Sequence, residues 1–240
     1  MNHNFYLWLF LFLTTTLGGC SRYRVSVQGV DLDLLNRSFS PQSFPQSKTP
    51  AAGHNNLGII LEKGGNLSGA LAQYRLALEA DPELIVAYIN AGNICFKLNN
   101  FAGADYYYRE ALRLNPDNPR ALNNLAWLFL KKNEEIPAAI ILIRKAVSAD
   151  ADHSYLYLDS LGWALYQNKE PEEAIRTLKT ALEETPEEKT YLLSETHYHL
   201  GLIYLEQGEK EKALSHLRTS LELTEAPSRK EEIRSLLNSP

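Results

Sequence analysis

The sequence contains very little cysteine: its 240 residues include two, Cys20 and Cys95. Cys20 follows two glycines at the end of an apolar run, whereas a structural cysteine is expected inside a periodic core segment. This position indicates a processing step at Cys20. Cys95 then has no second cysteine with which to form a disulfide. An exported chain of this kind must be held together by packing alone.

Charged residues are absent from the first 19 positions, and only the α-amine supplies the positive charge that usually begins a signal peptide. Residues 5–13 read FYLWLFLFL, an apolar core of the length that secretory signal peptides use. Counting to Leu17 gives 13 mostly apolar positions, fewer than the roughly 20 that span a bilayer as a helix. A transmembrane anchor and a buried N-terminal helix are the alternatives to a signal peptide.

The end of the apolar run favours the signal peptide. The stretch LGGC at residues 17–20 resembles the bacterial lipobox, in which small residues precede the cysteine that becomes the new N-terminus. The resemblance implies that residues 1–19 are removed, that the Cys20 thiol carries diacylglycerol, and that its amine is then acylated, typically with palmitate. More than one acyl chain makes anchoring stable. Ser21 stands where an Asp commonly signals inner-membrane retention, so we expect the outer membrane, on its periplasmic side.

Strongly basic segments are also absent. Up to Arg120 the chain has 10 basic and 9 acidic residues, and from Ala121 onward it has 14 and 20. The net charge is −5. Nucleic acid is therefore not an expected partner.

Sequence motifs of catalysis are missing as well. There is no nucleophile elbow, no dinucleotide-binding or P-loop glycine pattern, and no CxxC or HExxH spacing. His197 and His199 lie two residues apart, so on a helix they point to different faces and do not form a metal site. We therefore expect no enzyme activity, no cofactor, no metal and no small-molecule substrate.

From Ala51 onward the sequence repeats with a period of 34 residues. Each unit holds two segments with apolar residues at helical spacing, joined by a polar turn, and small residues recur at positions 8, 20 and 27. This pattern resembles the tetratricopeptide repeat (TPR) and covers residues 51–227. It implies an all-α, right-handed TPR superhelix, an α-solenoid. The five predicted repeats are 51–84, 85–118, 119–153, 155–188 and 194–227.

The segments outside the repeats have their own predicted roles. Residues 20–50, rich in Ser, Pro and Gln, read as a lipid-anchored flexible tether with a reach of about 30 Å. Thr185-Pro186 followed by two glutamates predicts that the first helix of the fifth repeat begins near Pro186. A second capping pattern, from Ser228 to Glu231, predicts a final helix within residues 228–240 that covers the last repeat.

The first helix of each TPR lines the concave face of the superhelix. Asparagine recurs at position 6 and lysine at position 13 of the first three repeats, and seven residues make about two turns, so both share a face. An amide donates and accepts hydrogen bonds, so a ladder of amides can pair with an extended peptide backbone, while lysines contact acidic groups. The predicted groove residues are Asn56, Asn90, Asn93, Asn124, Lys63, Lys97, Lys131, Phe96, Trp127 and Trp163.

Each of these groove assignments has an alternative. Asparagine and lysine at these positions are also common consensus choices, with lysine favoured by the dipole at a helix C-terminus. Trp127 and Trp163 either anchor a ligand or pack between adjacent first helices. Ser160 and His199 replace asparagine in the last two repeats, so ligand contacts should centre on the first three.

The combined features predict a membrane-anchored TPR adaptor or scaffold that binds an extended protein segment in its groove. Its layout looks like that of TPR pilotin lipoproteins and of TPR lipoproteins that present substrates in the cell envelope. The resemblance implies a role in envelope complex assembly or substrate presentation. The alternative is a structural subunit that associates with copies of itself.

Overall fold

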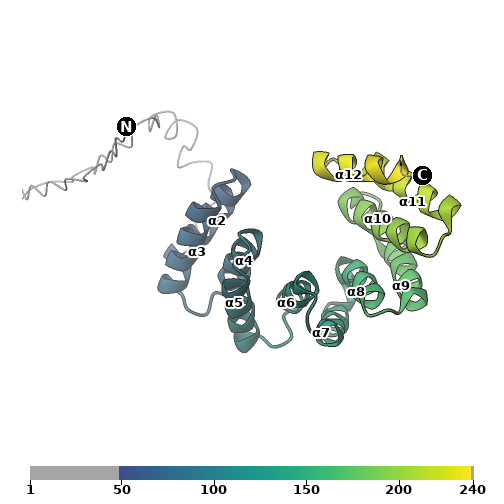
Figure 1. Ribbon diagram of the computed structural model, residues 1–240. Coiled ribbons are helices and arrows are strands. Elements are labelled where there is room, and N and C mark those ends of the chain that lie inside the picture. The colour runs from purple at the N-terminus through teal and green to yellow at the C-terminus, as the bar shows by residue number, and fades with distance from the viewer. Residues whose placement is uncertain (1–48, 239–240) are drawn as a thin grey trace, which may run out of the picture. The chain divides into compact units, whose positions relative to one another are not determined.

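The computed structural model describes residues 49–238, which belong to one compact unit of the chain (Figure 1). The predicted signal peptide, Cys20, the tether up to residue 48 and residues 239–240 lie outside the described residues. The described residues form eleven α-helices and no strand. The elements are α2 (Pro50–Lys63), α3 (Leu67–Ala80), α4 (Ile85–Lys97), α5 (Phe101–Leu114), α6 (Pro119–Lys132), α7 (Ile136–Ala149), the 3₁₀ turn η1 (Ala151–His153), α8 (Tyr155–Gln167), α9 (Pro171–Glu184), α10 (Thr190–Glu206), α11 (Lys210–Leu223) and α12 (Pro227–Leu237).

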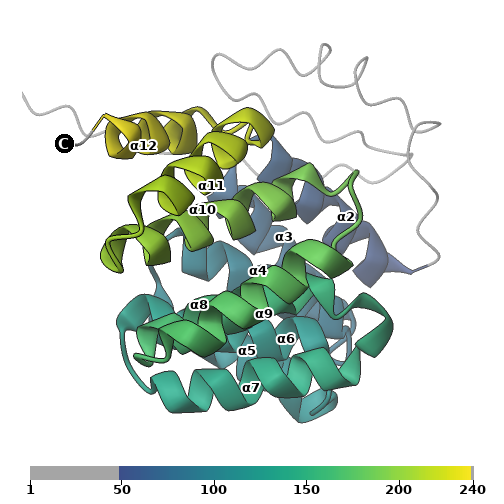
Figure 2. The same cartoon turned by 90° about the vertical axis from the view of Figure 1, so that its right-hand side faces the viewer.

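Successive helices pair into five hairpins, which stack side by side. In Figure 1 the even-numbered helices from α2 to α10 lie on the inner side of this curved array, and their odd-numbered partners lie on the outer side. Figure 2 shows α12 lying over α11 at the C-terminal end. The predicted all-α solenoid of five repeats with a C-terminal capping helix is therefore confirmed.

Each hairpin depends on a close contact between its two helices. A Cβ atom added to Gly58 in α2 would lie 2.5 Å from the ring of Tyr74 in α3, which is inside van der Waals contact. Gly92 in α4 meets the ring of Tyr108 in α5 in the same way. The alanines at repeat positions 20 and 27 are fully buried in every hairpin that has them. Small residues at these positions thus allow the ring of the second helix to lie against the backbone of the first.

This contact gives a test of the repeat alignment. Ala104 in α5 is fully buried, so Ala104→Glu would place a carboxylate in the hairpin interior without a partner. We expect it to lower the free energy of unfolding by about 3 kcal/mol or more, measured by thermal or urea denaturation. Ala102→Glu, on the exposed side of the same helix, is the matched control and should leave stability nearly unchanged. Equal melting curves for both variants would contradict the alignment.

The first hairpin lacks a preceding hairpin within the described part of the chain. Leu57 in α2 is 43% exposed, whereas Leu125, Leu161 and Leu200 occupy the same repeat position and are buried. In those later repeats the preceding hairpin covers this position. Burial in the array therefore comes from the neighbouring repeat, as expected for a solenoid.

The prediction that the first helix of the fifth repeat begins near Pro186 is wrong. The helix α10 begins at Thr190, and residues 186–189 form a turn in which the Lys189 N–H donates to the Pro186 carbonyl at 2.9 Å. The Thr185 hydroxyl donates to the Ala181 carbonyl at 2.6 Å, so it closes the end of α9 and cannot cap a new helix. Even so, α10 has 17 residues, against 13 or 14 in the other helices of the hairpins.

The capping helix begins slightly earlier than its capping pattern predicts. The first helical residue of α12 is Pro227, and Ala226 precedes it without a side-chain hydrogen bond, so Ser228 lies within the first turn. Ile233 is fully buried and packs with Tyr198 of α10 and Leu217 of α11. This contact covers the apolar face that the fifth hairpin would otherwise expose.

Charged and aromatic groups fasten α12 to α10. The Arg229 guanidinium lies 3.9 Å from the centre of the Tyr198 ring and donates to the Glu195 carboxylate at 2.8 Å. The Tyr198 hydroxyl donates to Glu232 at 2.6 Å. Burial alone would lower the pKa of Arg229, but the hydrogen bonds to Glu195 raise it overall, so the guanidinium stays charged.

Candidate binding groove

The predicted asparagine ladder forms bridges between neighbouring inner helices. Asn90 in α4 is 8% exposed, and its Nδ2 donates to Asn55 Oδ1 of α2 at 3.0 Å. Asn124 in α6 is half-buried, and its Nδ2 donates to Asn93 Oδ1 of α4 at 2.8 Å. The amide nitrogens of both ladder residues are therefore already used inside the protein.

The two later interfaces between inner helices carry bridges of different chemistry. Trp127 Nε1 of α6 donates to Ser160 Oγ of α8 at 2.7 Å. His199 Nδ1 of α10 lies 2.9 Å from Asp159 Oδ1 of α8. Each pair of adjacent inner helices thus has at least one polar bridge. In α6, Asn123 keeps a buried amide oxygen without a hydrogen-bond partner among residues 49–238.

These bridges could be found only in part from the sequence. Asn90 and Asn124 follow from the 34-residue period, but their partners Asn55 and Asn93 lie at different repeat positions. The period therefore does not show which amides meet. Asn90 connects two hairpins through its amide nitrogen. This role differs from both interpretations of the sequence, in which Asn90 either binds a peptide backbone or is only a consensus residue of the repeat.

The bridge assigns a stability effect to Asn90. Asn90→Ala leaves Asn55 Oδ1 buried without its donor, so we expect the free energy of unfolding to fall by about 1–3 kcal/mol in urea denaturation. Asn56→Ala is the matched control, because the Asn56 side chain forms no hydrogen bond within residues 49–238. Adding Asn55→Ala to Asn90→Ala should cost less than Asn55→Ala does alone. Simple additivity of the two changes would contradict the bridge.

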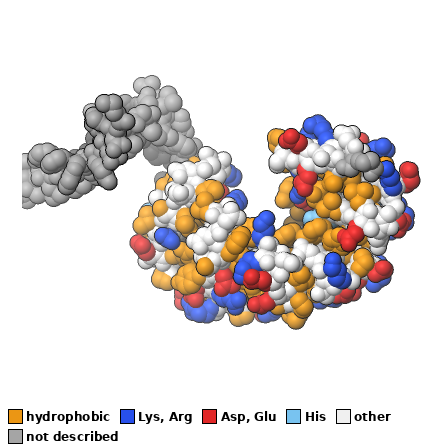
Figure 3. Space-filling model, viewed as in Figure 1, with side chains coloured by type: hydrophobic (Ala, Val, Ile, Leu, Met, Phe, Trp, Pro, Cys, Tyr) orange, Lys and Arg blue, Asp and Glu red, His pale blue; other side chains and the backbone are white. Residues whose placement is uncertain are grey.

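A pocket of about 390 Å³ opens on the inner side of the array. Helices α4, α5, α6 and α10 supply its walls. Figure 3 shows this side of the array hollowed, with Lys or Arg side chains on the floor of the hollow and hydrophobic ones along the wall formed by the C-terminal helices. The residues that line the pocket are Asn93, Phe96, Lys97, Tyr108, Asn124, Trp127 and Tyr191.

The pocket presents amide groups that can still bond a ligand. Asn93 Oδ1 accepts from the Tyr108 hydroxyl at 2.9 Å and from Asn124 Nδ2 at 2.8 Å, so that oxygen is satisfied. Burial raises the pKa of Tyr108, which therefore remains a hydroxyl donor. Asn93 Nδ2 and Asn124 Oδ1 have no partner within residues 49–238. One donor and one acceptor are what an extended peptide backbone needs.

The predicted groove lysines differ in their partners. Lys97 Nζ forms an ion pair with Glu62 Oε1 at 2.7 Å, and Glu62 also accepts from the Tyr74 hydroxyl at 2.9 Å. Lys63 and Lys131 are exposed and form no ion pair within residues 49–238. All three lie at the ends of inner helices, with Lys97 at the pocket itself.

The aromatic groove residues divide into two groups. Phe96 and Trp127 line the pocket. Trp163, at the same repeat position as Trp127, instead stacks on His199 with ring centres 4.5 Å apart, and contacts Tyr166. Trp163 therefore packs between inner helices. The sequence analysis missed Tyr108 as a pocket residue because its repeat position predicts core, and missed Tyr191 because it lies between repeats.

Two histidine rings lie side by side between α10 and α11. His197 Nδ1 lies 2.8 Å from His216 Nδ1, and burial, together with the charges of His197 and Lys179, lowers the pKa of His216 to about 4. Both rings are thus neutral at pH 7. Within residues 49–238 no three His, Cys, Asp or Glu side chains are grouped to hold a metal ion. The same residues include no helix with the length and apolarity to cross a bilayer.

Stacked helical hairpins with small residues at each crossing define a helical-repeat protein. The chain belongs to the tetratricopeptide repeat family: TPR family models match residues 51–84, 92–133 and 157–226, which together make up more than half of the chain.

Solved TPR structures superpose on most of the chain. PilW, a widely conserved type IV pilus biogenesis factor, has 17% identity and a TM-score of 0.67, covering 80% of this chain and 93% of PilW. PilF of Pseudomonas aeruginosa has 20% identity and a TM-score of 0.63, covering 78% and 82%. YrrB, a TPR protein with an unusual peptide-binding site, has 22% identity and a TM-score of 0.52, covering 81% and 97%. These likenesses establish the shared fold.

Proposed function

We propose that this protein is a lipid-anchored adaptor of the bacterial cell envelope that holds an extended segment of a protein partner in its groove. Lipid on Cys20 attaches it to the outer membrane, facing the periplasm. The TPR array then presents the pocket near that membrane, in support of complex assembly or substrate presentation.

The pocket on the inner side of the array is the observation that carries the binding role. It brings together aromatic rings, a lysine, a free amide donor and a free amide acceptor. A flat polar surface would offer no such combination, and interfaces generally depend on aromatic anchors in pockets. The fold of YrrB, which has a peptide-binding site, and the role of PilW in pilus biogenesis agree with this proposal.

The sequence around residues 17–20 is the observation that supports the proposed membrane anchor. An apolar core without charge precedes LGGC, and a Ser-, Pro- and Gln-rich segment follows it before the first helix. Such a segment would let the TPR array reach a partner about 30 Å from the bilayer.

The anchor predicts the behaviour of two cysteine variants. Cys20→Ser should abolish incorporation of a fatty-acid probe in cells and should leave the signal peptide uncleaved, because the processing chemistry uses the thiol. Cys95→Ser removes the other cysteine, which is buried in α4, and should be labelled like the wild type. Equal labelling of the wild type and Cys20→Ser would refute the lipoprotein assignment.

The groove predicts where a partner cross-links. A photo-reactive phenylalanine analogue is placed at Asn124 in the pocket or at Arg176, which is exposed on the outer helix α9, and the adducts are identified by mass spectrometry. We expect a protein adduct from Asn124 and none from Arg176. An adduct from Arg176 alone would exclude the groove as the site. An adduct only to another copy of this chain would favour the structural subunit over the adaptor.

A further inference from the structure

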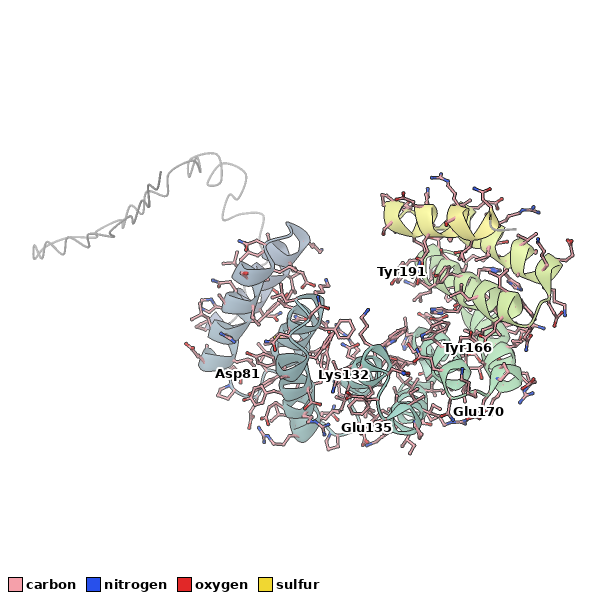
Figure 4. The ribbon with its side chains drawn as sticks, in the orientation of Figure 1. Asp81, Lys132, Glu135, Tyr166, Glu170 and Tyr191 are labelled. Carbon is pink, nitrogen blue, oxygen red and sulfur yellow. The ribbon has the colours of Figure 1, made fainter. Side chains whose placement is uncertain are left out.

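One exposed aromatic residue breaks the regularity of the repeats. Tyr191 lies in the first turn of α10, in the extra length that distinguishes this helix from the other inner helices. Its side chain is 70% exposed, more than any other large hydrophobic side chain among the described residues. Figure 4 shows Tyr191 at the end of α10 that borders the hollow. Most of this large ring is therefore free to contact a ligand.

Tyr191 nevertheless belongs to a pocket built by other repeats. The remaining lining residues come from α4, α5 and α6, in the second and third hairpins, whereas Tyr191 comes from the fifth. The extra turn of α10 therefore extends across the groove to the part where the free amides lie.

The turn that carries Tyr191 is firmly held. The Leu193 N–H donates to the Lys189 carbonyl at 3.2 Å, and the Thr196 hydroxyl donates to the Leu192 carbonyl at 3.0 Å. Ser194, directly after the turn, is buried, and its carbonyl accepts from the Ser220 hydroxyl of α11 at 2.8 Å. The position of Tyr191 is thus set by the backbone rather than by a mobile loop.

The pocket surfaces around Tyr191 define the chemistry of an occupant. The Trp127 N–H is used by Ser160, so the indole offers mainly its apolar surface, as Phe96 does. These rings and Tyr191 line the same pocket of about 390 Å³, so its chemistry suits a large apolar or aromatic side chain. Asn93 Nδ2 and Asn124 Oδ1 can pair with the backbone of the same segment.

The charge of the neighbouring inner helices indicates which residues should flank the ligand side chain that enters the pocket. Lys63, Lys97, Arg120 and Lys131 are exposed at groove positions of α2, α4 and α6. The charge of Glu62 offsets that of its partner Lys97, so Lys63, Arg120 and Lys131 supply the excess of positive charge on these helices. This positive surface stands out in a chain of net charge −5, and it complements an acidic segment.

We propose that Tyr191 closes a specificity pocket that accepts a large apolar or aromatic side chain, flanked by Asp or Glu, from an extended segment of a partner protein. This inference rests on the proposed binding role of the groove. It adds the residue that selects the ligand and the sequence that the ligand must carry.

Peptide selection tests the proposal without knowledge of the partner. A phage library of random dodecapeptides is selected on the full chain in detergent, and the enriched peptides are synthesised and titrated by fluorescence anisotropy. We expect an aromatic or large aliphatic residue with acidic neighbours to be enriched. Tyr191→Ala should weaken binding of these peptides roughly tenfold, as expected for an interface anchor.

Matched variants separate the pocket from general effects. Tyr106→Ala removes another exposed tyrosine, 57% exposed on the outer helix α5, and should bind like the wild type. Tyr191→Phe should also bind like the wild type, because the ring rather than the hydroxyl closes the pocket. Circular dichroism melts should be unchanged for all three variants. Raising the salt concentration should weaken wild-type binding, since the flanking charges are exposed.

The outcomes distinguish this proposal from the broader binding role. If peptides bind and Asn124→Ala or Trp127→Ala weakens them while Tyr191→Ala does not, the groove is the site and the role of Tyr191 is wrong. Enriched peptides without acidic or large apolar residues would also refute it. If no peptide binds, or binding is insensitive to every groove variant, both the specificity pocket and the groove adaptor are wrong.

Discussion

The close approach of two helices within each hairpin is the contact on which the rest of the structure depends. Glycine at the crossing lets a ring such as Tyr74 or Tyr108 lie against the backbone of the inner helix. A larger residue there would separate the helices and change the angle at which one hairpin meets the next. Because every hairpin has a small residue, glycine or alanine, at its crossing, the inner helices line up on one side, and their remaining side chains form a groove.

The polar residues of that groove serve two purposes. Some connect neighbouring inner helices, as Asn90 does with Asn55, and these are shielded from solvent. Asn93 and Asn124 also connect two inner helices, but each keeps one free hydrogen-bonding group at the pocket. Residues at equivalent repeat positions can therefore differ in role. Trp127 lines the pocket, whereas Trp163 stacks on His199 between helices.

The longer helix α10 gives the groove a site that a regular array of repeats would lack. In a solenoid each repeat contacts only its neighbours. The longer α10 brings Tyr191 to residues of the second and third hairpins, so the curvature of the array and the extra turn act together. The last repeat is also held by α12 through Ile233 and the Arg229–Glu195 ion pair, which keeps this arm of the groove in place.

The sequence by itself determined the helical hairpins, their number and the face that each helix buries, because the 34-residue period and the small residues at positions 8, 20 and 27 act locally. It also placed Lys63, Lys97 and Lys131 on inner helices. Only the tertiary structure decided which amides bond to each other, where α10 begins, and that Tyr191 joins a pocket with Phe96 and Trp127. These features depend on the stacking of hairpins that are distant in the chain, and no repeat position specifies which side chain of one hairpin reaches another.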